Sequence, residues 1–126
     1  MKKIVIVDDE PHIRALLEQA LEDFEDEGVE IHLAVDGEDA INVIKEEKPD
    51  LIFLDVMMPK VDGFEVCRII KKELGMSNVY IIMLTAQGQE FDKQLGRQAG
   101  ADIYMTKPFN PDDIVAKAAE VLQIEI

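Results

Sequence analysis

The chain has 126 residues, of which 48% are apolar and 32% charged, a composition typical of a folded domain that excludes a disordered chain. Asp and Glu total 27 against 13 Lys and Arg, so the formal net charge of −14 argues against non-specific binding to nucleic acid or to an anionic membrane. Cys67 is the one cysteine, so no internal disulfide is possible, and no apolar run reaches signal-peptide or transmembrane length. We expect one cytoplasmic domain over residues 1–126, without an output domain.

The apolar pattern alternates between strand and helix five times along the chain. Continuous apolar runs, as in 4–7 and 51–54, are typical of strands buried on both faces, whereas the alternation over 29–35 predicts a half-buried edge strand. Pro11 suits the first turn of a helix, and Gly75 suits the end of another. In chain order, the predicted elements are strand 4–7, helix 11–24, strand 29–35, helix 37–48, strand 51–54, helix 64–74, strand 79–84, helix 91–98, strand 102–106 and helix 111–123.

Strands that alternate with helices favour a parallel sheet whose right-handed crossovers cover both faces. The predicted fold class is therefore α/β, a doubly wound, flavodoxin-like (βα)5 sandwich with a five-stranded parallel sheet in the order 2-1-3-4-5. The helix over 64–74 is predicted to bury an inner stripe made of Phe64, Cys67, Ile70 and Leu74. His12 on a solvent-facing helical turn and His32 on the edge strand lack a second properly spaced nitrogen or sulfur ligand, which disfavours a metal site there.

Two of the apolar runs end abruptly in carboxylates. Asp8 and Asp9 follow the run 4–7, and Asp55 follows the run 51–54. Ligands of open α/β sheets bind outside the carboxyl ends of the strands, so these carboxylates converge if the two strands are neighbours. At about 5 Å and an effective dielectric near 20, each ionised pair repels by roughly 3 kcal/mol, so the cluster calls for a cation, a proton or a chemical task. Helix capping explains one acid at this position but hardly two.

A hydroxyl and a lysine follow these acids at the ends of later strands, which gives the series Asp8-Asp9, Asp55, Thr85 and Lys107-Pro108. The segments around them are Val-Asp-Asp-Glu-Pro at 7–11, Leu-Asp-Val-Met-Met-Pro at 54–59, Asp-Gly at 62–63, Leu-Thr-Ala at 84–86 and Gly-Ala-Asp at 100–102. In this order, the series resembles the receiver domain of two-component response regulators over essentially the whole chain. The length is similar to that of stand-alone receivers, such as chemotaxis-type output proteins and phosphorelay intermediates.

The resemblance implies a phosphorylation-operated signalling protein rather than an enzyme. Asp55 would attack the phosphohistidine of a sensor histidine kinase and carry the phosphoryl group as an aspartyl phosphate. Asp9 would bind Mg²⁺ directly and Asp8 directly or through water, together with Asp55 and the backbone carbonyl of Met57. Magnesium prefers oxygen ligands and keeps several waters, which leaves room for phosphoryl oxygens.

The resemblance also implies roles for residues on the last two strands. Lys107 would pair first with Asp55 and then with the phosphoryl group, and its peptide bond to Pro108 is cis in the family. The hydroxyl of Thr85 would reach a phosphoryl oxygen, while the ring of Tyr104 would turn inward as its switch partner. The alternative to a switch role is structural: Thr85 would cap the loop after its strand, and Tyr104 would pack half-buried.

The expected partners are a helical-bundle phosphohistidine domain of the kinase and a downstream protein target or phosphotransferase. A monomer is expected, with dimerisation on activation left open. Met57 and Gln87 stand at the two positions that tune the phosphoryl lifetime in the family. Apolar contacts to the kinase are predicted from Pro11, Ile13, Leu16, Pro108 and Phe109.

Several alternatives remain open from the sequence. A phosphorelay intermediate would pass its phosphoryl group onward to a histidine phosphotransferase. A Mg²⁺-dependent phosphohydrolase of the haloacid-dehalogenase type requires a second Asp two residues after Asp55, where Met57 stands. A nucleotide or flavin module is disfavoured because neither a G-x-G-x-x-G after the first strand nor a G-x-x-x-x-G-K-[ST] occurs. The intact acids, Thr85 and Lys107 argue against a scaffold that works without phosphorylation.

Overall fold

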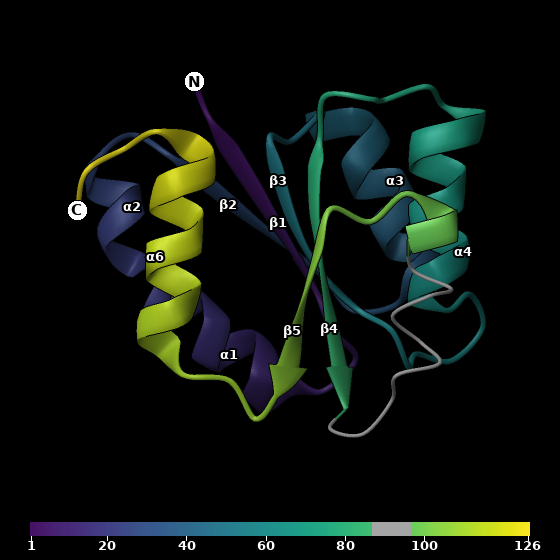
Figure 1. Cartoon of the computed structure of the whole chain (residues 1–126), viewed down its shortest axis with the longest axis horizontal. Coiled ribbons are helices and arrows are strands. Elements are labelled where there is room, and N and C mark those ends of the chain that lie inside the picture. Colours follow the sequence, from purple (N-terminus) through teal and green to yellow (C-terminus); the bar gives the residue numbers. More distant parts are fainter. Residues whose placement is uncertain (87–96) are drawn as a thin grey trace.

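The computed structural model describes residues 1–86 and 97–126. Its strands form one parallel sheet in the order β2-β1-β3-β4-β5 (Figure 1), as the alternating pattern predicts. The strands are β1 (Lys3–Val7), β2 (Glu30–Ala34), β3 (Leu51–Asp55), β4 (Tyr80–Ala86) and β5 (Ile103–Lys107). The helices of the described residues are α1 (Pro11–Ala20), α2 (Glu22–Asp26), α3 (Gly37–Glu47), α4 (Gly63–Arg68), its wider continuation η1 (Ile69–Glu73) and α6 (Pro111–Leu122).

Helices cover both faces of the sheet, and each face has its own apolar core. Helices α1, α2 and α6 lie on one side and α3 and α4 on the other (Figure 1). Alternate residues of one strand serve the two cores: Ile4 and Ile6 of β1 pack under α1 and α6, whereas Val5 and Val7 pack under α3 and α4. The central strands are therefore apolar on both faces, which is why their sequences read as continuous runs.

The helix predicted over 11–24 is wrong as a single element, because the structure divides it at Leu21 into α1 and α2. The backbone of Leu21 leaves the helical region, with φ −97° and ψ 6°. Leu21 at the junction and Leu17 and Phe24 on either side of it are all fully buried. The apolar spacing continues across the break, so periodicity alone gives no sign of it.

The inner stripe predicted for 64–74 is correct for Cys67 and Ile70, which are fully buried, and wrong for Leu74, which is 38% exposed. In the wide turn η1 the Leu74 N–H donates to the Ile69 carbonyl five residues earlier, at 2.8 Å. One extra residue in the turn moves Leu74 off the buried side, because a regular helix bonds four residues back. Gly75 has φ 64°, which agrees with its predicted place at the helix end.

Two further findings concern the remaining predicted elements. The helix predicted over 91–98 falls mostly on residues 87–96, which lie outside the described residues. The strand predicted over 102–106 is found one residue later, as β5. Within 1–86 and 97–126, none of the helices combines the length and the apolar character that a bilayer crossing requires.

Candidate functional site

The acidic cluster forms because β1 and β3 are neighbours in the sheet. Val7 pairs with Leu54 in the parallel register, so the residues that follow, Asp8 and Asp55, leave the sheet side by side at its carboxyl edge. Asp8 is fully buried and Asp55 is only 4% exposed. Two carboxylates with so little access to water repel each other strongly unless a cation or a proton lies between them.

Lys107, at the end of β5, supplies a positive charge to this cluster. Its ammonium nitrogen donates to Asp8 Oδ2 at 2.9 Å and to Asp55 Oδ1 at 3.1 Å. Glu10 Oε1 lies 3.8 Å from the same nitrogen. The remaining oxygen of Asp8 accepts the Glu10 backbone N–H at 2.9 Å. Lys107 therefore bridges the two buried acids, and its one charge faces more than one carboxylate.

The electrostatics of Asp55 reflect this imbalance. Burial, and next the negative charge of Asp8, raise the pKa of Asp55 to about 7, against the opposing effect of Lys107. Burial by itself lowers the pKa of Lys107, but its hydrogen bonds and charge interactions with Asp8 and Asp55 raise it above its ordinary value. At neutral pH the lysine is thus charged, while Asp55 carries a proton part of the time unless a further cation is present.

The donor set of the cluster fits a magnesium ion. Asp8, Asp9 and Glu10 can each present one carboxylate oxygen so that the three oxygens lie within 4.8 Å of one another. Asp9 is exposed, in contrast to the buried Asp8 and Asp55. Carboxylate oxygens suit Mg²⁺, and the exposed Asp9 and Glu10 leave one side of the donor set open to the water ligands that Mg²⁺ retains. A cation bound beside Asp55 would stabilise the ionised carboxylate and so lower the pKa that burial and repulsion raise.

Met57, which the resemblance places in the ion site through its carbonyl, lies in the loop after β3 with a side chain that is 65% exposed. Gly63 holds this loop against the strand end, because its N–H donates to the Val56 carbonyl at 2.9 Å. A Cβ at position 63 would meet the Asp55 carbonyl oxygen at 2.3 Å. The loop thus returns to within backbone contact of Asp55, and only glycine fits at this approach.

Thr85 and Tyr104 lie on the same face of the sheet. Thr85 pairs with Thr106 and Met83 pairs with Tyr104, so Thr85 and Tyr104 are diagonal neighbours on adjacent strands. Thr85 is 1% exposed, whereas Tyr104 is partly buried and packs against the α3–α4 core. The register places the two residues at diagonal positions on one face, and their role as a switch pair stays a prediction.

Apolar side chains predicted to contact a kinase surround the cluster at the start of α1 and after β5. Pro11, Leu16 and Pro108 are exposed, whereas Ile13 and Phe109 are partly buried against the α1–α6 core. The peptide bond between Lys107 and Pro108 is cis, as the resemblance implies.

Two residues next to the cluster were missed by sequence reasoning, namely Glu10 and Arg14. A guanidinium nitrogen of Arg14 donates to the Asp8 backbone carbonyl at 2.7 Å, and Glu10 lies beside Lys107. Residue spacing offered no signal for this contact, because Asp8 precedes α1 and lies six positions from Arg14. Gln87, predicted to affect the phosphoryl lifetime, lies outside the described residues.

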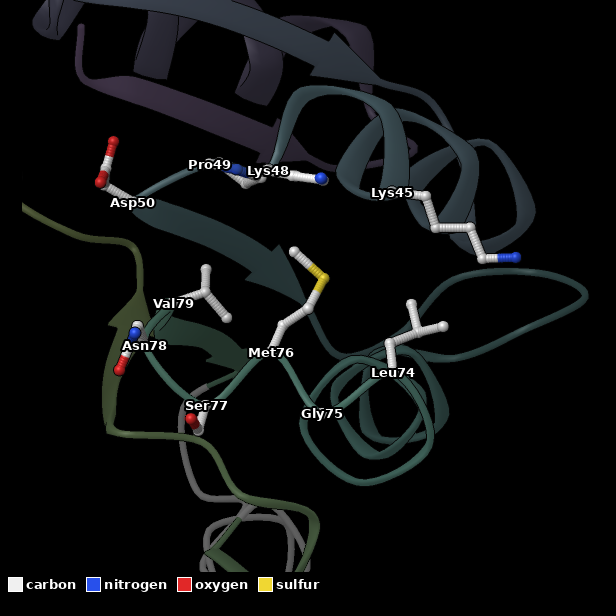
Figure 2. Close-up of a pocket in the computed structure, with 10 residues that line it drawn as sticks. All are labelled: Lys45, Lys48, Pro49, Asp50, Leu74, Gly75, Met76, Ser77, Asn78 and Val79. Carbon is white, nitrogen blue, oxygen red and sulfur yellow. The ribbon is translucent and has the colours of Figure 1, made fainter.

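A pocket of about 460 Å³ lies at the opposite, amino-terminal end of the strands, between the ends of α3 and η1. Figure 2 shows Met76 and Val79 from the segment before β4 facing the turn that precedes β3. Its charged lining residues are Lys45, Lys48 and Asp50. The acidic cluster at the carboxyl edge is thus separate from this pocket.

A five-stranded parallel sheet in the order 2-1-3-4-5, flanked by helices, defines the fold class as that of flavodoxin-like receiver domains. The chain belongs to the response regulator receiver domain family, whose sequence profile matches residues 4–119. Proteins of this family are signalling components of two-component systems.

Relatives of known name support this assignment. The chain is 48% identical over 122 residues to the alkaline phosphatase synthesis transcriptional regulatory protein PhoP of Bacillus subtilis (strain 168). That match covers 97% of this chain and 49% of PhoP, so the chain spans about half the length of this relative.

Solved structures of similar proteins support the same family and fold. The BeF3-activated receiver domain of DrrB, a response regulator of Thermotoga maritima, is 34% identical with a TM-score of 0.85, and 98% of each chain is covered. The chemotaxis protein CheY4 of Vibrio cholerae is 32% identical with a TM-score of 0.84, covering 96% of this chain and 98% of CheY4.

Proposed function

We propose that this receiver domain accepts a phosphoryl group on Asp55 from the phosphohistidine of a sensor histidine kinase and that the product switches its surface. The observation that supports this proposal best is the bridge formed by Lys107 between Asp8 and Asp55. The bridge joins the Asp55 carboxylate, the Lys107 ammonium group and the Asp8 carboxylate in one hydrogen-bonded cluster. Positioning and charge neutralisation are the main contributions that a protein makes to phosphoryl transfer.

In the proposed reaction, an oxygen of Asp55 attacks phosphorus while the bond from phosphorus to the imidazole nitrogen breaks. The product is an acyl phosphate on Asp55, and the imidazole leaves with the electron pair of the broken bond. Lys107 would offset the charge on the transferred group, and the Thr85 hydroxyl would donate to one of its oxygens. A magnesium ion held by Asp8, Asp9, Asp55 and the Met57 carbonyl would supply further charge neutralisation.

The switch would operate through the same contacts. Moving a two-state surface from 1:99 to 99:1 requires about 5.5 kcal/mol of differential stabilisation. New charge-assisted hydrogen bonds from the phosphoryl group to Lys107 and Thr85 are of a size to supply much of it. Tyr104 is the diagonal neighbour of Thr85. Movement of Thr85 would therefore change the space that is open to the Tyr104 ring.

The wider setting is also a proposal. The 126 residues would act as one receiver unit in the cytoplasm, as a monomer that could dimerise on activation, without direct contact with nucleic acid. The receiver would take its phosphoryl group from a helical-bundle kinase domain and signal to a protein target. A relay that passes the group to a histidine phosphotransferase uses the same acceptor chemistry.

The test is intact-mass analysis after incubation with acetyl phosphate, with and without Mg²⁺. We expect one added phosphoryl group on the wild type, and no addition to Asp55→Asn or after chelation of the metal. Asp9→Asn should label much more slowly, whereas Asp26→Asn, an exposed acid of α2, should label as the wild type does. Equal labelling of Asp55→Asn and the wild type would refute the proposed acceptor.

A further inference from the structure

A second group of metal-binding side chains lies on the other side of the molecule from Asp55, at the free edge of the sheet. Glu30 and His32 occupy alternate positions of the edge strand β2, so both side chains project from the face that α3 covers. Glu47 is the last residue of α3 and reaches the same place. The fold therefore brings together an imidazole and two carboxylates that the sequence separates by up to 17 positions (from 30 to 47).

The donor atoms converge on the imidazole. His32 Nε2 lies 3.0 Å from Glu30 Oε1 and 3.3 Å from Glu47 Oε1. The three side chains can present one nitrogen and two oxygens that all lie within 4.8 Å of one another. The exposed fractions of the side chains are 42% for Glu30, 30% for His32 and 22% for Glu47, so the group is open to solvent on the Glu30 side.

The two distances from the imidazole nitrogen are compatible with a tetrahedral metal site. With metal–ligand bonds of about 2.0–2.1 Å, the ligand atoms of tetrahedral Zn²⁺ are about 3.3–3.4 Å apart. The two distances from His32 Nε2, 3.0 and 3.3 Å, are already close to this spacing. We propose that Glu30, His32 and Glu47 form a site for Zn²⁺ or a related first-row divalent ion, with solvent as the fourth ligand.

The donor chemistry separates this site from the acidic cluster at Asp8. One imidazole nitrogen with two carboxylates favours zinc and its neighbours over magnesium, which prefers oxygen ligands throughout. His12, the other histidine, lies 3.5 Å from Glu10 but its side chain is 74% exposed on the first turn of α1. It serves as the matched control, since its loss removes an imidazole without touching the edge strand.

Lys3 would compete with a metal ion for Glu47. Its ammonium nitrogen lies 3.1 Å from Glu47 Oε1, the same oxygen that faces His32. A metal ion at the site has to share or displace this ion pair. Replacing the lysine by methionine keeps most of the aliphatic chain and removes the competing charge, so Lys3→Met should bind the metal more tightly than the wild type.

The test is a Zn²⁺ titration by calorimetry, in a millimolar excess of Mg²⁺ that occupies carboxylate-only sites. We expect one Zn²⁺ per chain for the wild type and for His12→Gln, affinity at least about tenfold weaker for His32→Gln and Glu47→Gln, and tighter binding for Lys3→Met. Far-ultraviolet circular dichroism of each variant confirms the fold. No stoichiometric binding by the wild type, or unchanged affinity in both His32→Gln and Glu47→Gln, would overturn the proposal.

Discussion

At the scale of single residues, the decisive contact is the pair of hydrogen bonds from Lys107 to Asp8 and Asp55. The three side chains come from the ends of three strands, and two of them are almost completely buried. One positive charge facing two buried carboxylates leaves a net negative site. Burial of Asp55, and next the negative charge of Asp8, raise its pKa, which links the stability of the domain to pH and to cations.

Asp55→Asn should stabilise the metal-free domain above neutral pH. The pKa of Asp55 is about 7 in the folded state and near the ordinary value of about 4 in the unfolded state. Between these two values the unfolded chain loses the Asp55 proton first, so this group makes stability fall as the pH rises from about 4 to about 7. The amide has no charge to bury, and we expect it to add roughly 1–3 kcal/mol at pH 8 and little at pH 4.

The measurement is urea denaturation of both proteins across this pH range in the presence of a chelator, with Asp26→Asn as the control for an exposed acid. A gain for Asp55→Asn that is the same at pH 4 and at pH 8 would contradict the assigned ionisation of Asp55.

At the scale of elements, the site depends on how the strand ends and their loops approach one another. The loop after β3 returns so closely that Gly63 contacts the backbone of Asp55 and Val56. Asp62 then starts α4, since its side chain accepts the Glu65 N–H at 2.9 Å. A turn and a helix cap thus fix the backbone beside Asp55.

Gly63→Ala should distort the site as well as destabilise the fold. The added methyl group would lie 2.3 Å from the Asp55 carbonyl oxygen and 2.9 Å from Val56 Cα, so the strand end has to shift. Overpacking of this kind costs about 1–3 kcal/mol, and we expect labelling by acetyl phosphate to slow as well. Gly28→Ala is the comparison, because φ is 86° there and no atom lies within 4 Å of the new Cβ.

Gly28→Ala should lose stability through backbone strain alone and label at the wild-type rate. If the two variants lost stability but labelled equally fast, the close approach at Gly63 would not be positioning the acceptor.

The apolar pattern of the sequence predicts helices and strands correctly where burial is the main constraint on them. The runs that became β1 and β3 lie between two helical layers, so their apolar residues are continuous, and the alternation with helices predicts that they belong to a parallel sheet. It fails where backbone geometry changes inside an apolar pattern, as at Leu21 between α1 and α2 and at Leu74 after the wide turn η1. Periodicity reports which residues are apolar and not how many residues each turn contains.

For the site, position at strand ends predicted that Asp8 and Asp55 converge if their strands are neighbours, and the family resemblance added Lys107. The sequence could not show that Lys107 contacts Asp8 as closely as Asp55, nor that Glu10 lies beside it, because both depend on side-chain directions in a crowded edge. The sequence also could not show that Glu30, His32 and Glu47 lie together, because Glu47 comes from the far end of a helix.

At the scale of the whole molecule, the cluster lies at one edge and is bordered by exposed apolar residues of α1. Leu16 and Leu74 have the same exposed fraction, 38%, but Leu16 is on α1 whereas Leu74 lines the pocket at the amino-terminal end of the strands. If a kinase docks beside the cluster, only one of these leucines is covered in the complex. The pair therefore offers a matched comparison for the docking surface.

Leu16→Glu should slow phosphoryl transfer from the phosphohistidine domain of a kinase by about tenfold or more, the effect of losing one apolar contact of roughly 1.4 kcal/mol at an interface. Labelling by acetyl phosphate should not change, because the small donor needs no docking surface. Leu74→Glu should leave both reactions at the wild-type rate. Equal slowing by Leu16→Glu and Leu74→Glu in the kinase reaction would rule out α1 as the docking surface.

The central claim is that Asp55 is the acceptor, and the most direct measurement identifies the modified residue itself. Borohydride reduces an acyl phosphate to an alcohol, so phosphorylated protein treated with it should contain homoserine at the acceptor position. After labelling with acetyl phosphate and Mg²⁺, tandem mass spectrometry should find homoserine at position 55 and unchanged aspartate at positions 8 and 9. Homoserine at position 8 or 9, or phosphorylated protein with no homoserine at position 55, would contradict the account.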